Sequence, residues 1–382
     1  MGLFRRVTAV LGVLALCGMT GCAGFWVAVN NTNSSSSGNT TGDHVYVANA
    51  NASNATASLA GFAVGTGTLT AVTNSPYSLP FFPTSVVVNP ANTIVFVAGN
   101  SEILAFAIQS DGSLIQMNNT SPVGYAAVAS MDISPDGNWL IALDQNNISL
   151  DEFQINSSTG VLTPVTPLTT YPVLSGATTI ARAVKFAPNG ENLFAALGTA
   201  GYVVYTFTTS NGLLSNPLTP QALTSGTSAN ALAVSPNSAY LYIAMSGTGG
   251  GLAAYTIGSG GALTSVSGSP FAAGTQPFSV VVDTAGTDVY VANRGDSTIS
   301  EYSTTANSST QFPLLGTISS GDAVTALAVD NSGNDLLAAA NGGSADLTMY
   351  SYDATTAGKL DFSASASTGT DPTGPVAIAA TH

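Results

Sequence analysis

The chain has 382 residues, and charged residues make up only 7% of it, against about 25% in ordinary soluble domains. Six basic residues face 20 acidic ones, so the formal net charge is −14 at pH 7. This excess of negative charge repels phosphate backbones and anionic lipid headgroups, which excludes nucleic acid as a partner. Solubility must then come from the abundant Ser, Thr, Asn and Gly residues.

The chain begins with a basic pair, Arg5 and Arg6, which precedes an apolar run over residues 7–16. The run is too short to span a bilayer as a permanent helix, and it lies where a secretory signal peptide has its apolar core. We therefore predict a signal peptide over residues 1–21. Without Arg5 and Arg6, four basic residues remain against the same 20 acidic ones.

The apolar run leads to Met19-Thr20-Gly21-Cys22, which resembles the lipobox of bacterial lipoproteins. The resemblance implies cleavage before Cys22 and acylation of this residue, so Cys22 is the predicted lipidation site. It also implies a membrane-anchored lipoprotein of the cell envelope that faces the periplasm or the exterior. The alternative is an ordinary signal peptidase that cuts after Ala23 and removes Cys22.

The two cysteines of the chain, Cys17 and Cys22, both lie in this leader region. The folded part therefore has no disulfide, no thiolate metal ligand and no cysteine nucleophile. Residues 22–42 are rich in Asn, Ser, Thr and Gly, and they predict a flexible linker because they offer too little apolar surface for a core. The folded domain is predicted over residues 43–382.

One aromatic residue recurs along the chain at nearly even spacing. Its seven positions are Phe62, Phe106, Phe153, Tyr205, Tyr255, Tyr302 and Tyr350. The first and the last lie 288 positions apart, so six intervals give a repeat of 48 residues. A period of this length is typical of repeat architectures in which each unit is one small piece of secondary structure.

Each unit begins with two short apolar strands joined by a turn rich in Asn, Asp and Gly, as tight hairpins require. The first strands are predicted at 86–88, 131–133, 184–186, 232–234, 280–282 and 327–329. The second strands, each ending on alanine, are predicted at 45–48, 95–98, 139–142, 193–196, 241–244, 289–292 and 336–339. A fixed alanine and a fixed ring suggest neighbouring units that stack face to face.

The third strand carries the recurring aromatic residue, and in every unit except the sixth a Gly-x-Leu motif follows it. The glycine predicts a turn and the leucine opens a fourth strand. Four strands per unit at this period predict an all-β fold, a single seven-bladed β-propeller with four antiparallel strands per blade. Nothing after the leader shows helical periodicity, and we expect a monomer.

The two ends of the repeat region complement each other. The region starts inside a unit, at the second strand 45–48, and it finishes with a segment over 376–378 that matches a first strand. We therefore predict that the N- and C-terminal strands pair and complete one blade. Such pairing closes the ring and removes free sheet edges, which otherwise invite aggregation.

The second-strand tetrapeptides that begin at Val45, Leu241 and Val289, together with a preceding Pro-x-x-Val-x-Val strand, resemble the YVTN-type repeat. The whole pattern resembles the seven-bladed propellers of the lactonase-like family, to which the 6-phosphogluconolactonases belong. The resemblance implies a lactone hydrolase with a His, Arg and Glu cluster at a channel mouth. The chain has only His44 and His382, at the two ends of the repeat region, so no catalytic histidine can be carried over.

In such propellers the connections from fourth to first strand and from second to third strand share one face. We predict that this face binds the ligand through Asp144, Arg182, Arg294, Asp296 and Asp322. Candidate catalytic residues are Arg182, Arg294, Asp132 and Asp296. Two arginines would hold a carboxylate or a sugar there, with a nearby aspartate as base.

Asp132 and Lys185 occupy the same position in adjacent first strands. One interpretation is an ion pair between blades near the axis, since charges that deep need a partner. The other interpretation assigns them to the polar channel mouth. We expect the ends of the repeat region, opposite the binding face, to carry the linker.

Other polar motifs suggest weaker hypotheses. Glu152 and Glu301 lie at equivalent positions before the aromatic residue, as a remote candidate for a glycosidase pair. The tripeptide 294–296 spells an adhesion motif but coincides with an expected turn. We expect His44 and His382 to be exposed, and we predict no metal site and no cofactor.

The sequence favours two functions. The first is an exported, lipid-anchored propeller that acts as a binding module at the cell envelope, for a protein partner or a glycan. The second is an extracytoplasmic lactonase or related hydrolase of the 6-phosphogluconolactonase-like family. Residue types alone do not decide between binding and catalysis.

Overall fold

The structure is a computed structural model, and it describes residues 42–50, 57–147, 149–166, 169–170, 179–215, 217–218, 220–305, 312–342, 345–369 and 375–382. The predicted signal peptide, the lipidation site Cys22 and nearly all of the linker lie outside these residues. No helix among the described residues is long and apolar enough to cross a membrane.

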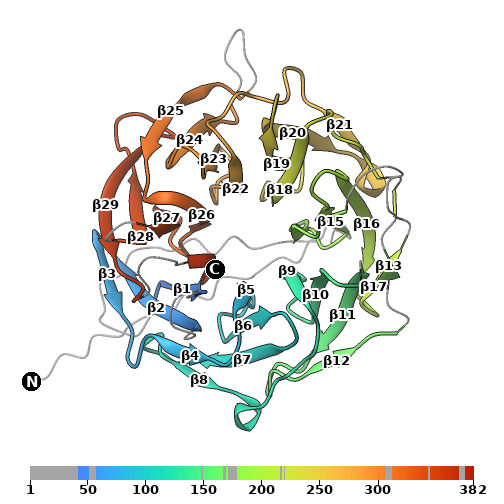
Figure 1. Ribbon diagram of the computed structural model, residues 1–382, viewed down its shortest axis with the longest axis vertical. Coiled ribbons are helices and arrows are strands. Elements are labelled where there is room, and N and C mark those ends of the chain that lie inside the picture. Colours follow the sequence, from blue (N-terminus) through green and yellow to red (C-terminus); the bar gives the residue numbers. More distant parts are fainter. Residues whose placement is uncertain are drawn as a thin grey trace, which may run out of the picture. The chain divides into compact units, whose positions relative to one another are not determined.

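Seven antiparallel sheets stand around a central axis as the blades of a propeller (Figure 1). Blade 1 contains β30 (Pro375–Ala380), β1 (His44–Asn49), β2 (Ala57–Gly65) and β3 (Thr68–Ala71), with β4 (Tyr77–Leu79) beside β2. Blade 2 contains β5 (Pro83–Val88), β6 (Ile94–Gly99), β7 (Ile103–Ile108) and β8 (Leu114–Gln116). Blade 3 contains β9 (Val128–Ile133), β10 (Trp139–Asp144), β11 (Ser149–Ile155) and β12 (Leu162–Pro164), with β13 (Thr169–Thr170) beside β11.

The remaining four blades have four strands each in chain order. Blade 4 contains β14 (Ala183–Phe186), β15 (Asn192–Ala196), β16 (Tyr202–Thr208) and β17 (Leu213–Ser215). Blade 5 contains β18 (Thr227–Val234), β19 (Tyr240–Gly247), β20 (Gly251–Ile257) and β21 (Leu263–Ser265). Blade 6 contains β22 (Pro277–Val282), β23 (Asp288–Asn293), β24 (Thr298–Ser303) and β25 (Leu314–Ser319). Blade 7 contains β26 (Asp322–Val329), β27 (Asp335–Gly342), β28 (Leu347–Tyr352) and β29 (Leu360–Ala366).

The described helical structure is limited to two single 3₁₀ turns, η1 (Asn118–Thr120) and η2 (Ser259–Gly261). The prediction of an all-β propeller with seven blades is therefore confirmed. In each blade the first strand lies nearest the axis and the fourth forms the outer rim (Figure 1).

The predicted closure of the ring is also confirmed. Strand β30 pairs with β1 in antiparallel register, with Val45 opposite Ala380 and Val47 opposite Ile378. The His44 N–H donates to Thr381 Oγ1 at 3.0 Å, and the Thr381 N–H donates to His44 O at 2.9 Å. The last strand of the chain is thus the innermost strand of the first blade.

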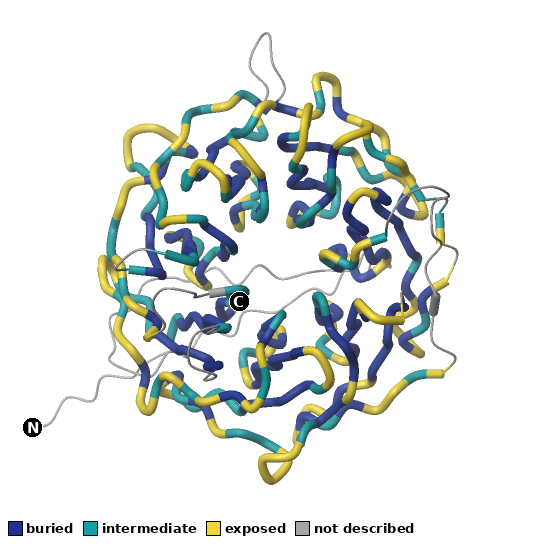
Figure 2. Tube along the Cα trace, viewed as in Figure 1, coloured by how far each residue is buried: buried dark blue, intermediate teal, exposed yellow. Residues whose placement is uncertain are grey.

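The core lies between neighbouring blades, where both faces of the middle strands are buried (Figure 2). In β6, Val95 and Val97 face blade 1, whereas Phe96 and Ala98 face blade 3. Side chains alternate between the two faces of a strand, so a strand that is covered on both faces is apolar at every position. Such coverage explains the unbroken apolar runs of the second strands.

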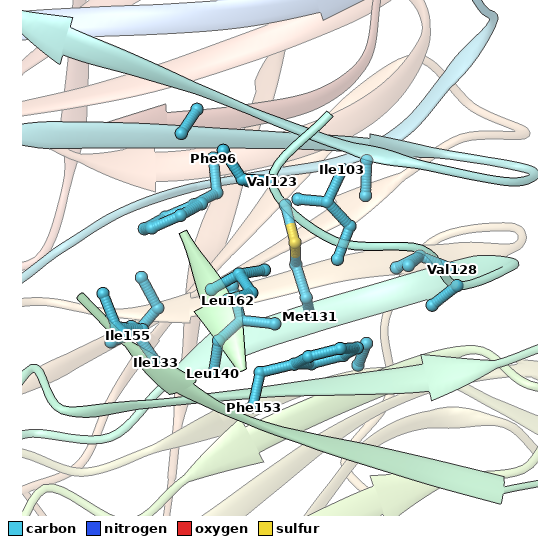
Figure 3. Packing of buried hydrophobic residues seen from close by; sticks show 14 of the residues in the cluster. Phe96, Ile103, Val123, Val128, Met131, Ile133, Leu140, Phe153, Ile155 and Leu162 are labelled. Carbon is cyan, nitrogen blue, oxygen red and sulfur yellow. The ribbon is translucent and has the colours of Figure 1, made fainter. Parts of the chain in front are cut away.

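The alanine and the ring of the repeat meet across the gap between blades. Ala98 of blade 2 and Phe153 of blade 3 belong to one buried cluster, together with Phe96 and Met131 (Figure 3). The same pairing of a second-strand alanine with the ring of the following blade occurs in six of the seven gaps. The predicted face-to-face stacking is therefore confirmed.

The third unit is the exception, and there the predicted register is wrong by one residue. Leu140, not Trp139, pairs with Phe153 and corresponds to the first residue of the other second strands. Leu143 consequently occupies the alanine position and packs in one cluster with Tyr205 of blade 4. The prediction aligned Ala142 with the alanines of the other units. In this unit the alanine position is taken by Leu143, so the predicted strand was displaced by one residue.

Candidate functional site

The seven inner strands surround a central channel of about 660 Å³. Most of its wall is made of Val, Ala, Leu and Ile side chains of β5, β9, β14, β18, β22, β26 and β30. Only a few charged groups interrupt this wall, among them Arg182, Asp132 and Lys185. A mainly apolar cavity with a small number of polar groups is the usual form of a ligand site.

The channel has two ends with different side chains. We call the end at which the inner strands begin, marked by Thr84, Ala129 and Arg182, the start mouth. We call the end at which these strands finish, marked by Lys185 and His382, the end mouth. Because the strands are antiparallel, the connections from fourth to first strand and from second to third strand belong to the start mouth.

Arg182 lies at the start mouth, as predicted. It directly precedes β14, its backbone N–H donates to Ala196 O at 3.1 Å, and its side chain is exposed and lines the channel. Its position in the inner strand corresponds to that of Thr84, Asn230 and Phe278 in other blades. Arg182 is therefore the one cation that this ring of positions contributes within the described residues.

Arg294 lies in the turn between β23 and β24, also on the start side. Its guanidinium carbon is 5.0 Å from the centre of the Phe278 ring, a cation–π contact, and its backbone N–H donates to Gln276 O at 3.0 Å. The ring of Phe278 thus holds Arg294 on the start side of the ring, two blades from Arg182, and of the two arginines it is Arg182 that lines the channel. Sequence reasoning missed Phe278, although its alignment with Arg182 was available as a signal.

The other predicted residues of this face differ in what their carboxylates do. Asp296 accepts a hydrogen bond from the Thr275 N–H, and the bonds from Thr275 keep the pKa of this carboxyl below its ordinary range. Asp144 is buried, and it accepts bonds from the N–H groups of Asn146 and Asn147 at 2.7 and 2.6 Å. Asp322, the first residue of β26, is exposed.

The cations of the described residues divide into two pairs. Lys185 contacts Asp132 at 3.1 Å and Lys359 contacts Glu301 at 2.9 Å, so both lysines are in ion pairs. Among the described residues neither Arg182 nor Arg294 is in an ion pair, and both belong to the start side. These two arginines are therefore the described cations of the start side that are available to bind an anion.

At the end mouth the predicted ion pair between blades is confirmed. Asp132 Oδ1 is 3.1 Å from Lys185 Nζ, and Asp132 Oδ2 accepts the Phe186 N–H at 2.8 Å. Asp132 therefore ties β9 to β14, at the opposite end of the channel from Arg182. The alternative interpretation, which placed the pair at the same mouth as Arg182, is not supported.

The two histidines behave differently from each other. His382 lines the channel, and its Nε2 lies 3.2 Å from Val88 O. Loss of hydration of the imidazole against the channel wall, followed by the charge of Lys185, lowers the pKa of His382. The prediction that His44 is exposed is wrong, because this side chain is buried between blades 1 and 2 with 4% of its surface accessible. Within the described ranges no group of three His, Cys, Asp or Glu side chains could hold a metal ion.

Glu152 and Glu301 have structural roles instead of forming a pair. Glu152 Oε1 accepts the Leu214 N–H of blade 4 at 2.9 Å, and Glu301 Oε1 accepts the Leu360 N–H of blade 7 at 2.8 Å. Each glutamate therefore binds the Gly-x-Leu strand of the next blade, in separate parts of the ring. A glycosidase that uses these two carboxylates is incompatible with this arrangement.

Comparison with known proteins identifies a family and several solved structures that share this architecture. The sequence profile described as "Lactonase, 7-bladed beta-propeller" matches residues 181–376. No curated protein matches the chain.

Solved structures that cover nearly the whole propeller give the same answer for the fold. Two are named "putative 6-phosphogluconolactonase". The one from Bacteroides uniformis has a TM-score of 0.73 and 16% identity over 89% of this chain and 100% of that one. The one from Bacteroides fragilis has 0.72 and 15% over 90% and 98%. A periplasmic gluconolactonase of Pseudomonas aeruginosa has 0.68 and 15% over 89% and 99%. With the sequence profile and the seven blades in agreement, the chain belongs to the lactonase family of seven-bladed β-propellers.

Proposed function

We propose that this protein is an exported, lipid-anchored propeller whose start mouth binds a small ligand with a carboxylate group, such as a sugar acid. The observation that carries the proposal is a pair of arginines on this side of the ring, of which Arg182 lines the channel. Arg182 and Arg294 make no ion pair within the described residues, whereas both lysines do. A guanidinium is the side chain best suited to bind a carboxylate in a planar, bidentate manner.

Binding is favoured over catalysis by what the nearby acids already do. Asp144 is buried and accepts hydrogen bonds from two backbone N–H groups. The hydrogen bonds to Asp296 lower the pKa of Asp296, which makes Asp296 a weak base. Asp322 is exposed, as Asp296 is, and within the described residues it does not have the hydrogen bonds that lower the pKa of Asp296. A module that holds an anionic ligand needs only the two arginines and the apolar wall of the channel.

Lactone hydrolysis is the second candidate, and membership of the lactonase family favours it. In this reaction water would add to the lactone carbonyl, the ring C–O bond would break, and the ring oxygen would take a proton. Arg182 would stabilise the carbonyl oxygen as its negative charge grows, and Asp322 would accept the proton of the water. The product is a sugar acid, the ligand class of the first proposal.

The two candidates are separated with the full chain purified in detergent. Calorimetry measures the binding of gluconate and related sugar acids, and a pH-stat follows the opening of a lactone panel. We expect binding by the wild type that Arg182→Ala and Arg294→Ala each weaken at least tenfold. Glu191→Ala, an exposed charge in the β14–β15 turn on the other side of the ring, should change neither readout.

Asp322→Asn decides the role of that acid. If the protein is a hydrolase, this variant loses turnover and still binds the product. Lactone opening that either arginine variant abolishes would replace the binding proposal with the enzymatic one. The absence of any sugar-acid binding by the wild type would overturn the first proposal.

The membrane anchor is proposed on the leader sequence alone. Metabolic labelling with a radioactive fatty acid should mark the wild type and not Cys22→Ser, and the variant should leave the membrane fraction. A mature protein that begins at Gly24, without Cys22 and without label, would contradict the anchor and support cleavage after Ala23.

A further inference from the structure

Three exposed apolar side chains lie on the start side in three successive blades, the last of which also carries Arg182, and we call these three residues the row. Phe82, Tyr125 and Ile180 are 49%, 72% and 38% exposed. They lie in the connections that lead into β5, β9 and β14, the inner strands of three successive blades. Ile180 is two residues before Arg182, so it shares the connection into β14 with the cation of the start mouth.

This row stands apart from the other exposed apolar side chains of the described residues. Ile115, Leu314 and Phe362 belong to β8, β25 and β29, the outer strands of three different blades. Single apolar residues scattered on a rim are ordinary. Three in the corresponding connections of successive blades instead share one side of the ring.

Exposed amides accompany the row. Gln145 Nε2 donates to Asn100 Oδ1 at 2.8 Å, which joins the β6–β7 turn of blade 2 to the β10–β11 turn of blade 3. Both side chains are exposed, as is that of Asn146. Amides offer both donors and acceptors, which suits a ligand covered with hydroxyl groups.

We propose that this row, Phe82, Tyr125 and Ile180, extends the start mouth into a platform for an acidic oligosaccharide, one built of uronate sugars. Flat aromatic faces stack on the apolar faces of sugar rings, amides bind hydroxyls, and Arg182 binds a uronate carboxylate. The mixture of isolated rings and amides differs from the continuous apolar centre of a protein interface.

Charge selects the acidic class of sugar. The chain has a net charge of −14, and the start side holds both arginines that have no carboxylate partner within the described residues. A neutral glycan could accept hydrogen bonds from these guanidinium groups but could not form an ion pair with them. The proposal rests on the proposed function, because it assigns the ligand of the same mouth.

The test compares chain lengths on the full protein. Calorimetry measures galacturonate, tetragalacturonate and its fully methyl-esterified, neutral counterpart. We expect tetragalacturonate to bind at least tenfold more tightly than the monomer and the neutral chain to bind at least tenfold more weakly than the acidic one. Tyr125→Ala and Phe82→Ala should each weaken the tetramer about fivefold or more and leave monomer binding unchanged, and Tyr125→Phe should retain tight binding.

Phe362→Ala is the matched control, since this ring is 63% exposed but lies on β29, away from the row. It should change neither ligand. Equal affinity for monomer and tetramer would overturn this inference, and so would tetramer binding that Tyr125→Ala and Phe82→Ala do not weaken. In either case, monomer binding that depends on Arg182 would still support the proposed function. Equal binding of the neutral chain would also overturn this inference, and failure of both acidic ligands would overturn the two proposals together.

Discussion

At the scale of single residues, two acids at the seam between blades 1 and 7, Asp43 and Asp335, have raised pKa values. The Asp43 carboxylate accepts the N–H groups of Asn331 and Ser332 at 2.9 and 3.0 Å. Burial, with a hydrogen bond and repulsion from Asp330, raises the pKa of Asp43 to about 7. Burial together with Asp330 also raises the pKa of Asp335 to about 6. The folded protein therefore keeps protons here that the unfolded chain releases near pH 4.

The first prediction concerns the pH dependence of stability. A raised carboxyl pKa stabilises the fold fully below about pH 4, and the contribution of Asp43 is lost as pH rises to about 7. Asp43→Asn should flatten this decline. The limit for one proton is about 1.4 kcal/mol per pH unit, and partial solvation should keep the change well below it. Urea unfolding from pH 4 to 8 measures it, and an unchanged slope in the variant would contradict the assignment.

Buried tyrosines of the second strands need a hydrogen-bond acceptor from the next blade for their hydroxyl groups. Tyr46 Oη donates to Gly112 O at 2.9 Å and Tyr290 Oη donates to Gly358 O at 3.2 Å, and each glycine begins a Gly-x-Leu motif. Tyr242, at the same position in blade 5, faces blade 6, whose sequence lacks that motif. Among the described groups its buried hydroxyl has no hydrogen-bond partner.

The second prediction compares three identical changes. Tyr46→Phe and Tyr290→Phe should each lower the free energy of unfolding by about 1 kcal/mol, because a buried hydrogen bond is lost. Tyr242→Phe should be neutral or stabilising by up to about 1 kcal/mol, because it removes an unsatisfied buried group. Chemical denaturation of the three variants is the measurement, and equal losses in all three would refute the explanation.

At the scale of strands, serine side chains connect the inner edges of neighbouring blades. Ser85 Oγ accepts the Met131 N–H at 3.1 Å, Ser130 Oγ accepts the Val184 N–H at 3.2 Å, and Ser279 Oγ accepts the Leu327 N–H at 3.1 Å. The equivalent positions of the other blades are alanines, Ala183, Ala231, Ala326 and Ala377. Three of the seven junctions therefore carry this contact within the described residues.

The third prediction uses this difference. Ser85→Ala should lower the free energy of unfolding by about 1 kcal/mol, since the hydrogen bond to blade 3 disappears. Ala231→Ser should raise it by about 0.5 kcal/mol, because the new hydroxyl would lie beside the Val280 N–H, the counterpart of Met131 N–H. Thermal unfolding of both variants gives the comparison. A gain from Ser85→Ala would show that the contact does not stabilise the junction.

The strands were largely predictable from the sequence, because the same packing problem is solved seven times. The ring and the alanine recur since they share each gap, and the one slip, at Leu143, came where a larger residue filled the alanine position. The site was less predictable. The stacking of Arg294 on Phe278 within blade 6 and the burial of His44 between blades 1 and 2 are particular to those blades, so the shared repeat pattern does not reveal them.

At the scale of the whole molecule, the ring is held closed by backbone pairing between β1 and β30. The fourth prediction is that deletion of residues 375–382 prevents a folded propeller. The cut would expose the inner edge of β1 and remove the wall of the channel beside blade 1. Circular dichroism and gel filtration should show loss of cooperative unfolding and aggregation.

A crosslink at the same seam gives the opposite test. Val47 and Ile378 are directly opposite, and the described residues contain no cysteine, so Val47→Cys with Ile378→Cys would form one defined disulfide. Bridging two distant parts of the chain should raise the melting temperature under oxidising conditions, and a reductant should reverse the gain. A melting temperature that oxidation does not change would show that opening of this seam does not limit stability.

The position of β30 in blade 1 also fixes the order of events during biosynthesis. During translation β1 to β4 are synthesised before the strands of the other blades, and β30 is synthesised after them. Blade 1 of the nascent polypeptide therefore lacks its innermost strand until β30 has been made. Blade 1 is therefore the first blade to be started and the last to be completed, and a stalled or prematurely terminated product offers chaperones and proteases an open strand edge that the closed ring lacks.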